Sequence, residues 1–196
     1  MHKLASLRGE KGFTLIELLV VAAIIGILLA IAIPNLLKAR ISANEASAKK
    51  ALQTLRDAEG QYFEMDLDNN GTRDYINVIG SFGVVPSLRD PEGTGVEEDA
   101  LVDNSFQGAT ATADTLADCG NPKAGYCIAY DSTIVASAGG SLQDFGWEAS
   151  MTSFRKNGRR DYSVYGDGVI RCTLPDAAAT GSVGTFSSQR TDGACD

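Results

Sequence analysis

Sixteen consecutive residues, 18–33, carry no polar side chain (LLVVAAIIGILLAIAI). The apolar stretch extends from Phe13 to Leu37 and has only four interruptions: Thr14, Glu17, Pro34 and Asn35. At about 1.5 Å per residue, a helix of this length can cross the hydrocarbon core of a bilayer. The sequence therefore predicts a membrane-spanning helix near the N-terminus.

Two ordinary alternatives leave one residue unexplained. The stretch could be a cleaved secretory signal, with Ala30-Ile31-Ala32 as a small-residue cleavage site, or a plain single-pass anchor. Neither accounts for Glu17, because a carboxylate at the centre of a membrane helix costs roughly 2.5 to 3.5 kcal/mol, and less near the interface. We therefore expect a partner that compensates the charge of Glu17.

The residues around Glu17 resemble a known signal. The run Gly12-Phe13-Thr14-Leu15-Ile16-Glu17 follows a short basic leader, and it is similar to the type III signal of type IV prepilins. The stretch Ile33-Pro34-Asn35-Leu36-Leu37 is also similar to that family. The resemblance to type IV pilins and pseudopilins is close over residues 9–60 and returns over residues 160–171.

This resemblance implies how the N-terminus is processed. In the family a prepilin peptidase cuts at the position equivalent to the Gly12–Phe13 bond, and the new amine on Phe13 is commonly N-methylated. Glu17 then becomes the fifth mature residue. The amine of Phe13 and the carboxylate of Glu17 can neutralise each other, within one subunit or between neighbours in a filament, so both residues are expected to act in assembly.

The resemblance also implies an α+β pilin fold in five parts. Residues 1–12 are the leader, 13–36 the transmembrane and filament-core helix, and 37–62 an amphipathic continuation of that helix. Residues 63–125 are an irregular connection, and 126–196 hold an antiparallel sheet and a C-terminal disulfide region. Pro34 lacks a backbone donor, so a kink is expected just before it.

The amphipathic part follows helical spacing. Apolar or small residues recur every three, four or seven positions: Leu37, Ile41, Asn44, Ala48, Leu52, Leu55 and Tyr62. Charged residues lie mostly elsewhere: Lys38, Arg40, Glu45, Lys49, Lys50, Arg56, Asp57 and Glu59. Gly60 is a plausible stop signal, although a helix can tolerate it. The pattern predicts a helix lying on a sheet.

Alternation of β-forming residues predicts three or four antiparallel strands. They lie at 126–130, 145–151, 160–165 and 169–173, and Asn157-Gly158 and Asp167-Gly168 supply turns between the later ones. Residues 65–125 contain little periodicity and many turn-forming residues, so we expect a mainly irregular connection with a short strand or helix at most.

All four cysteines follow the apolar run, which favours an oxidising compartment and two disulfides: Cys119, Cys127, Cys172 and Cys195. Of the three connectivities, we favour the local one, 119 with 127 and 172 with 195. A zinc site is disfavoured because the one histidine, His2, lies in the leader and no C-x-x-C occurs.

Residues 66–74 (DLDNNGTRD) place oxygen ligands at relative positions 1, 3, 5 and 9 and a glycine at 6, like the start of an EF-hand calcium loop. Position 12 is Asn77 rather than a bidentate glutamate. An Asx-rich turn is the favoured reading, with calcium as the alternative, so no cofactor or metal is assigned.

The net charge of −8 argues against a protein that binds nucleic acid through many phosphate contacts. The mature chain has no histidine, no G-x-S-x-G and no glycine-rich phosphate loop, so no catalytic residue is predicted and no enzyme is expected.

The sequence thus predicts a structural pilin-like subunit that is processed by prepilin peptidase and polymerises into a helical type IV pilus filament with copies of itself. The subunit would sit in the bacterial inner membrane as a single-pass protein and then join a cell-surface pilus or a periplasmic pseudopilus. Its other partners would be the pilus or type II secretion assembly machinery. Two alternatives remain: a pseudopilin of a type II secretion system, and a membrane-anchored calcium-dependent binding domain.

Overall fold

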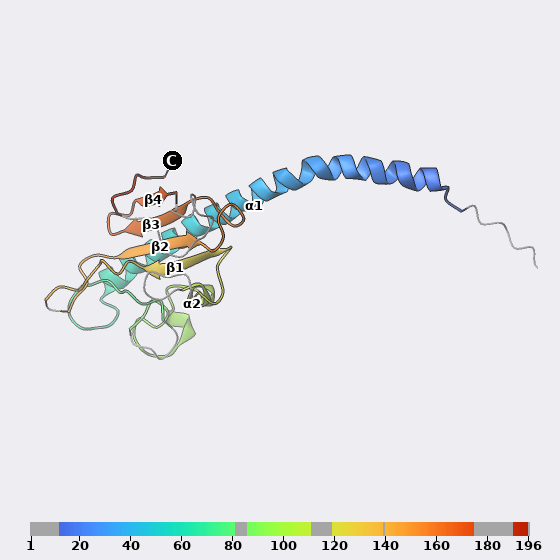
Figure 1. The fold of residues 1–196 in the computed structure, drawn as a ribbon. Coiled ribbons are helices and arrows are strands. Elements are labelled where there is room, and N and C mark those ends of the chain that lie inside the picture. The colour runs from blue at the N-terminus through green and yellow to red at the C-terminus, as the bar shows by residue number, and fades with distance from the viewer. Residues whose placement is uncertain (1–11, 81–85, 111–118, 139, 175–189, 196) are drawn as a thin grey trace, which may run out of the picture. The chain divides into compact units, whose positions relative to one another are not determined.

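The computed structural model describes residues 12–80, 86–110, 119–138, 140–174 and 190–195. The chain forms two compact units, Met1–Ala39 and Arg40–Asp196, and we call the second unit the head. In the described part of the first unit, residues 15–39 are helical. The head combines the rest of that helix with an antiparallel sheet, so the predicted α+β class is confirmed (Figure 1).

The long helix α1 (Leu15–Met65) begins two residues after Phe13. Gly60 does not end it, and the predicted stop at that position is wrong. A Cβ at Gly60 would meet no atom within 4 Å, so the residue sits on an open stretch of helix that a glycine tolerates. The helix ends where Asp66 takes a left-handed conformation with φ 48°, a backbone state that stops a helix.

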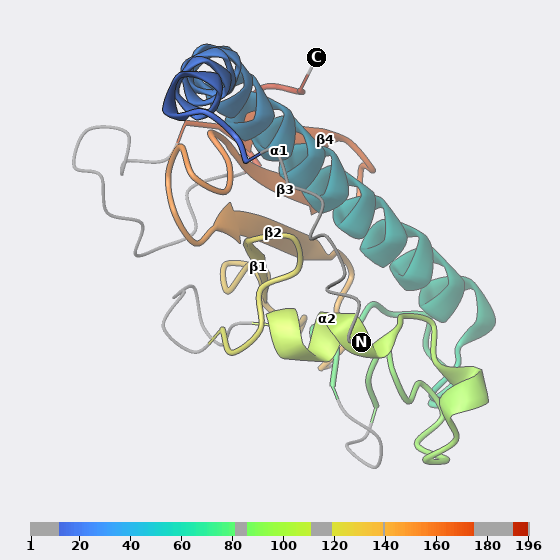
Figure 2. The ribbon, with the colours of Figure 1, turned by 90° about the vertical axis from the view of Figure 1, so that its right-hand side faces the viewer.

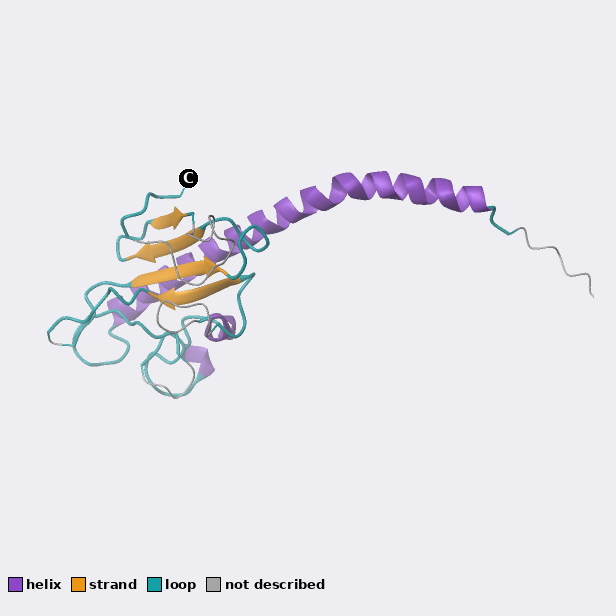
Figure 3. Cartoon of the chain, in the orientation of Figure 1, coloured by secondary structure: helices purple, strands orange, loops and turns teal. Residues whose placement is uncertain are grey.

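Four strands form one sheet in the described residues: β1 (Tyr126–Tyr130), β2 (Gly146–Met151), β3 (Asp161–Tyr165) and β4 (Ile170–Thr173). They lie in chain order and every neighbouring pair is antiparallel (Figure 3). Each strand falls within one residue of its predicted limits, because alternation and short turns mark this part of the sequence clearly.

The second half of α1 lies across one face of the sheet (Figure 2). Side chains from both elements form a single buried core, with Leu52, Leu55, Ala58 and Tyr62 from the helix and Trp147, Ala149, Met151, Tyr162 and Val164 from the sheet. The small residues Ala48 and Ala51 are also buried in this core, which lets helix and sheet approach closely. This is the packing that the helical spacing predicted.

The connection between α1 and β1 is organised by one buried cation. It contains a short 3₁₀ helix, η1 (Glu97–Asp99), and a short helix, α2 (Asn104–Ala109). Arg89 is only 1% exposed and its guanidinium donates to Gln107 Oε1 at 2.9 Å and to Glu97 Oε1 at 3.0 Å. The arginine therefore ties both short helices to the loop that carries it.

A disulfide lies at each edge of the sheet. Cys119 is bonded to Cys127 of β1, and Cys172 of β4 is bonded to Cys195. These are the two local pairs favoured from the sequence. Each bond fastens a neighbouring segment against the outermost strand, so the two edges are both tied to other parts of the chain.

Candidate processing and assembly site

The predicted cleavage junction is open to its surroundings. Gly12 and Phe13 are exposed, Phe13 by 84%. A Cβ built at Gly12 would meet no atom within 4 Å. Within the described residues this bond is open for an enzyme to reach, and no described atom requires glycine at position 12.

Glu17 has a local partner that the sequence argument missed. Glu17 Oε2 accepts hydrogen bonds from the backbone N–H and the Oγ1 hydroxyl of Thr14, both at 2.8 Å. In return, Thr14 Oγ1 accepts from the backbone N–H of Glu17 at 3.3 Å. This reciprocal arrangement is a capping box at the start of α1. The pattern Thr-x-x-Glu was visible in the sequence and predicts it.

The capping box places the carboxylate close to the N-terminus that cleavage after Gly12 would create. Cleavage after Gly12 would leave the amine on Phe13, the residue directly before Thr14. Glu17 would then face a cation as well as the free N–H groups of the first helical turn. The site can thus neutralise a charged chain end in an apolar setting, which is a role in positioning and not in bond making.

Nearly all large apolar side chains of residues 13–37 are exposed, among them Leu15, Ile16, Ile27, Ile31 and Leu36. Within the described residues, α1 is the one helix long and apolar enough to cross a membrane. Helix α1 continues through Pro34, so this residue does not end the helix. The kink expected there stays a prediction.

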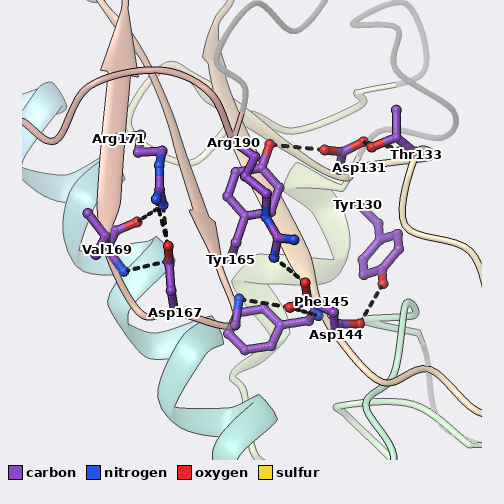
Figure 4. Close-up of polar contacts among 11 residues, drawn as sticks. Tyr130, Asp131, Thr133, Asp144, Phe145, Tyr165, Asp167, Val169, Arg171 and Arg190 are labelled. Atoms are coloured by element: carbon purple, nitrogen blue, oxygen red, sulfur yellow. Dashed lines mark hydrogen bonds and ion pairs between the residues drawn. The ribbon is translucent and has the colours of Figure 1, made fainter.

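A polar cluster surrounds Tyr165 at the end of β3 (Figure 4). The Tyr165 hydroxyl donates to Asp131 Oδ2 at 2.9 Å, and the guanidinium of Arg171 lies 5.8 Å from the ring centroid. Two ion pairs flank it: Asp167 with Arg171, and Asp144 with Arg190. The hydrogen bond from Arg171 is the main cause that lowers the pKa of Asp167. These contacts hold loops against the sheet.

The acidic loop 66–74 uses its own side chains as turn formers. Asp66 Oδ2 accepts from the Gly71 N–H at 3.1 Å, and Asn70 Oδ1 accepts from the Thr72 N–H at 2.7 Å. Burial and the neighbouring charge of Asp68 raise the pKa of Asp74. Among the described residues, no group of three or more His, Cys, Asp or Glu side chains is arranged to hold a metal ion.

The N-terminal site lies in a region that this chain shares with known proteins. Residues 7–33 match the family described as the prokaryotic N-terminal methylation motif. The chain is similar to the type IV major pilin protein PilA of Myxococcus xanthus, with 44% identity over 71 residues, which is 36% of this chain and 31% of that protein. It is also similar to the type IV wide pilus major component PilA4 of Thermus thermophilus, with 48% identity over 64 residues, covering 33% of this chain and 47% of that protein.

A third relative is matched over most of its length. The competence protein ComGC of Bacillus subtilis is 37% identical over 98 residues, which is 49% of this chain and 84% of that protein. No solved structure gives a significant match. The alignments thus span less than half of the two pilins and most of the competence protein. With the methylation motif, the Glu17 site and the helix-on-sheet head in place, the chain belongs to the type IV pilin and pseudopilin family.

Proposed function

We propose that this chain is a structural subunit of a type IV pilus, made as a membrane precursor, cut after Gly12 by a prepilin peptidase and assembled with copies of itself into a helical filament. The observation that carries the proposal is the junction itself. An exposed Gly12–Phe13 bond precedes a helix whose first turn holds Glu17 and whose next turns expose apolar side chains.

A continuous apolar surface of this size is unfavourable in water, so lipid or another protein chain must bury it. Leu15, Ile16 and Leu36 are 80%, 68% and 71% exposed in the single chain, far more than a soluble monomer leaves open in one continuous patch. Lipid would cover this surface before assembly, and the same helices of neighbouring subunits would cover it in a filament. The role is structural rather than catalytic, and the relatives named as pilus components support it.

The test is to image surface fibres in cells with and without the chain, and to measure the mass of the membrane-extracted protein. Fibres that depend on the chain, together with a chain starting at Phe13, are expected. A correctly cut chain that never reaches the cell surface would favour the pseudopilin alternative instead. A chain that starts at Met1 and forms no fibres would contradict the proposal.

The anchored calcium-dependent binding domain predicts a different result. Calcium should then raise the melting temperature of the wild-type chain, and Asp66→Asn should remove the effect. Our proposal expects no dependence on calcium, because no group of three or more His, Cys, Asp or Glu side chains among the described residues is arranged to hold a metal ion.

A further inference from the structure

Four basic residues are concentrated in the turn between β2 and β3. Residues 155–160 (RKNGRR) contain four of the chain's 17 basic residues, and no acidic residue lies between Glu148 and Asp161. The four side chains are exposed: Arg155, Lys156, Arg159 and Arg160. We call residues 152–160 the basic hairpin. The head is otherwise acidic, because only Glu10 and Glu17 of the chain's 25 acidic residues precede residue 40. The basic hairpin is the densest group of positive charge in the head.

The basic hairpin has a fixed shape. The Arg155 N–H donates to the Gly158 carbonyl at 2.7 Å, and Asn157 Nδ2 donates to Thr152 Oγ1 at 2.6 Å. Gly158 is packed so closely that an added Cβ would lie 1.9 Å from the Tyr126 hydroxyl. The fold therefore holds this turn rigidly, which lowers the entropy cost of using its side chains for binding.

Within the head, the basic hairpin contacts the first turns of α1 that belong to this unit. Asn44 Nδ2 donates to the Asn157 carbonyl at 2.9 Å, and Glu45 Oε1 accepts from the Arg159 N–H at 2.8 Å. Asn44 lies seven positions after Leu37, the last residue of the apolar stretch, so the basic hairpin contacts a part of α1 that closely follows the predicted membrane-spanning segment in the sequence.

Two of the four cationic groups contact uncharged side chains: the Arg155 guanidinium lies 5.3 Å from the Phe154 ring centroid, and Arg160 Nη1 donates to Cys172 Sγ at 3.7 Å. None of the four takes part in an ion pair with a described residue. Glu45 bonds to the backbone of Arg159 and not to its guanidinium. A cavity of about 390 Å³ is lined by Phe154, Arg155, Arg159 and Leu174, and Leu174 is 63% exposed. Guanidinium groups beside apolar side chains suit a phosphate headgroup at the edge of hydrocarbon.

We propose that the basic hairpin binds anionic phospholipid headgroups of the membrane that holds the subunit before assembly. The inference rests on the membrane insertion in the proposed function, but not on filament formation. The rest of the head, residues 40–196 without the basic hairpin, has 9 Lys and Arg against 23 Asp and Glu. Its net charge is repelled by an anionic surface, so this contact would orient the head at the bilayer. The contact must then break when the subunit leaves the membrane.

The test uses the full mature chain in lipid nanodiscs, one chain per disc. Hydrogen–deuterium exchange of residues 152–160 is compared between discs of phosphatidylcholine and discs that also contain phosphatidylglycerol. Slower exchange is expected only with phosphatidylglycerol, and high salt should abolish the difference because it screens surface charge. Each basic residue near an anionic surface is worth roughly a fivefold change in binding, so Lys156→Gln with Arg159→Gln should weaken the contact about 25-fold.

The matched control is Lys50→Gln with Arg73→Gln, which removes two exposed charges from other parts of the head. It should keep the protection. Equal exchange in the two kinds of disc, or equal loss in both variants, overturns the lipid contact. Protection that needs a second chain in the disc and ignores lipid charge also overturns it, and assigns the hairpin to an acidic neighbouring subunit. A chain that does not enter discs overturns membrane insertion as well.

Discussion

Glu59 of α1 accepts a hydrogen bond from the indole Nε1 of Trp147 in β2 at 2.7 Å, across 88 positions of sequence. Its other oxygen accepts from the Ile76 N–H at 3.1 Å. Both Glu59 and Trp147 are fully buried. One carboxyl group thus fastens the helix to the sheet and to the connection that follows the helix.

This carboxyl group should make stability depend on pH. Burial raises the pKa of Glu59 to about 8, against the opposing effect of its two hydrogen bonds, from an ordinary value of 4.5. The folded head then binds more protons than the unfolded chain between these two values. The free energy of unfolding attributable to Glu59 should fall as pH rises through that window, by up to about 1.4 kcal/mol per pH unit, and level off above it.

Glu59→Gln should remove that slope because an amide does not ionise. Glutamine has one accepting oxygen and keeps only one of the two hydrogen bonds, so the variant should also be less stable than wild type at low pH. Urea unfolding of the two proteins from about pH 5 to pH 9 measures it as the difference between their curves. Glu64→Gln, an exposed position on the same helix, is the control and should leave the slope as in wild type. Parallel curves for Glu59→Gln and wild type would show that Glu59 does not titrate in this range.

Glu59 also shows where prediction from the sequence ends. The helical spacing correctly placed Leu52, Leu55 and Tyr62 on the buried face, and Glu59 was assigned with the charged residues away from it. The structure buries Glu59 because Trp147 offers a donor there, and no local pattern connects two residues so far apart. A buried carboxylate is expected only once its partner is known.

Local sequence signals also divide the predictable parts of the fold from the unpredictable ones. The strands were predictable because alternation and Asn-Gly or Asp-Gly turns are local signals. The organisation around Arg89 was not, since its partners Glu97 and Gln107 follow no periodic spacing. The capping box at Glu17 was predictable from Thr14 three residues earlier, and it offers a local role for a residue that resemblance alone assigned to assembly.

Processing at the Gly12–Phe13 bond predicts a defined mass. Membrane-extracted protein should begin at Phe13, with an added methyl group where methylation occurs. Gly12→Val should leave the chain uncut and still inserted, because a side chain would intrude where the peptidase accommodates glycine. The chain itself has room at this position, so misfolding would not explain the loss.

Gly26→Ala is the matched control, since a Cβ there also meets no atom within 4 Å. It should be cut normally. A mature chain that begins at Ile33 would instead identify a secretory signal and contradict this prediction.

The disulfides should protect the edges of the sheet. The backbone N–H of Cys195 donates to the Ile170 carbonyl at 3.0 Å, so the bond to Cys172 holds a segment along β4. Replacing Cys172 and Cys195 with serine should cost roughly 3 kcal/mol in the chain-entropy account and free that edge for pairing between copies.

Urea unfolding and light scattering measure the two effects, and peptide mapping without reductant should recover the 119–127 and 172–195 pairs in wild type. The variant should be less stable and should associate at concentrations where wild type does not. A double-serine protein that is as stable and as dispersed as wild type would rule out a protective role for this bond.

Glu17 has two roles that substitutions can separate. Glu17→Ala removes both the charge and the capping box, so surface fibres should fall sharply while the membrane-bound pool stays at normal abundance, because an apolar side chain is tolerated by the bilayer. Glu17→Gln keeps a side chain that can complete the capping box but removes the charge. Thr14→Ala weakens the capping box and keeps the charge.

If the carboxylate neutralises the Phe13 amine during assembly, Glu17→Gln should lose fibres as severely as Glu17→Ala, and Thr14→Ala should keep most of them. If Glu17 acts only by starting the helix, the order reverses: Thr14→Ala loses fibres and Glu17→Gln keeps them. Fibre and membrane pools are quantified in the same cells by immunoblot of sheared and membrane fractions. Unchanged fibre yield in both Glu17 variants would contradict any assembly role for this residue, since its burial in a filament would then need no charged partner.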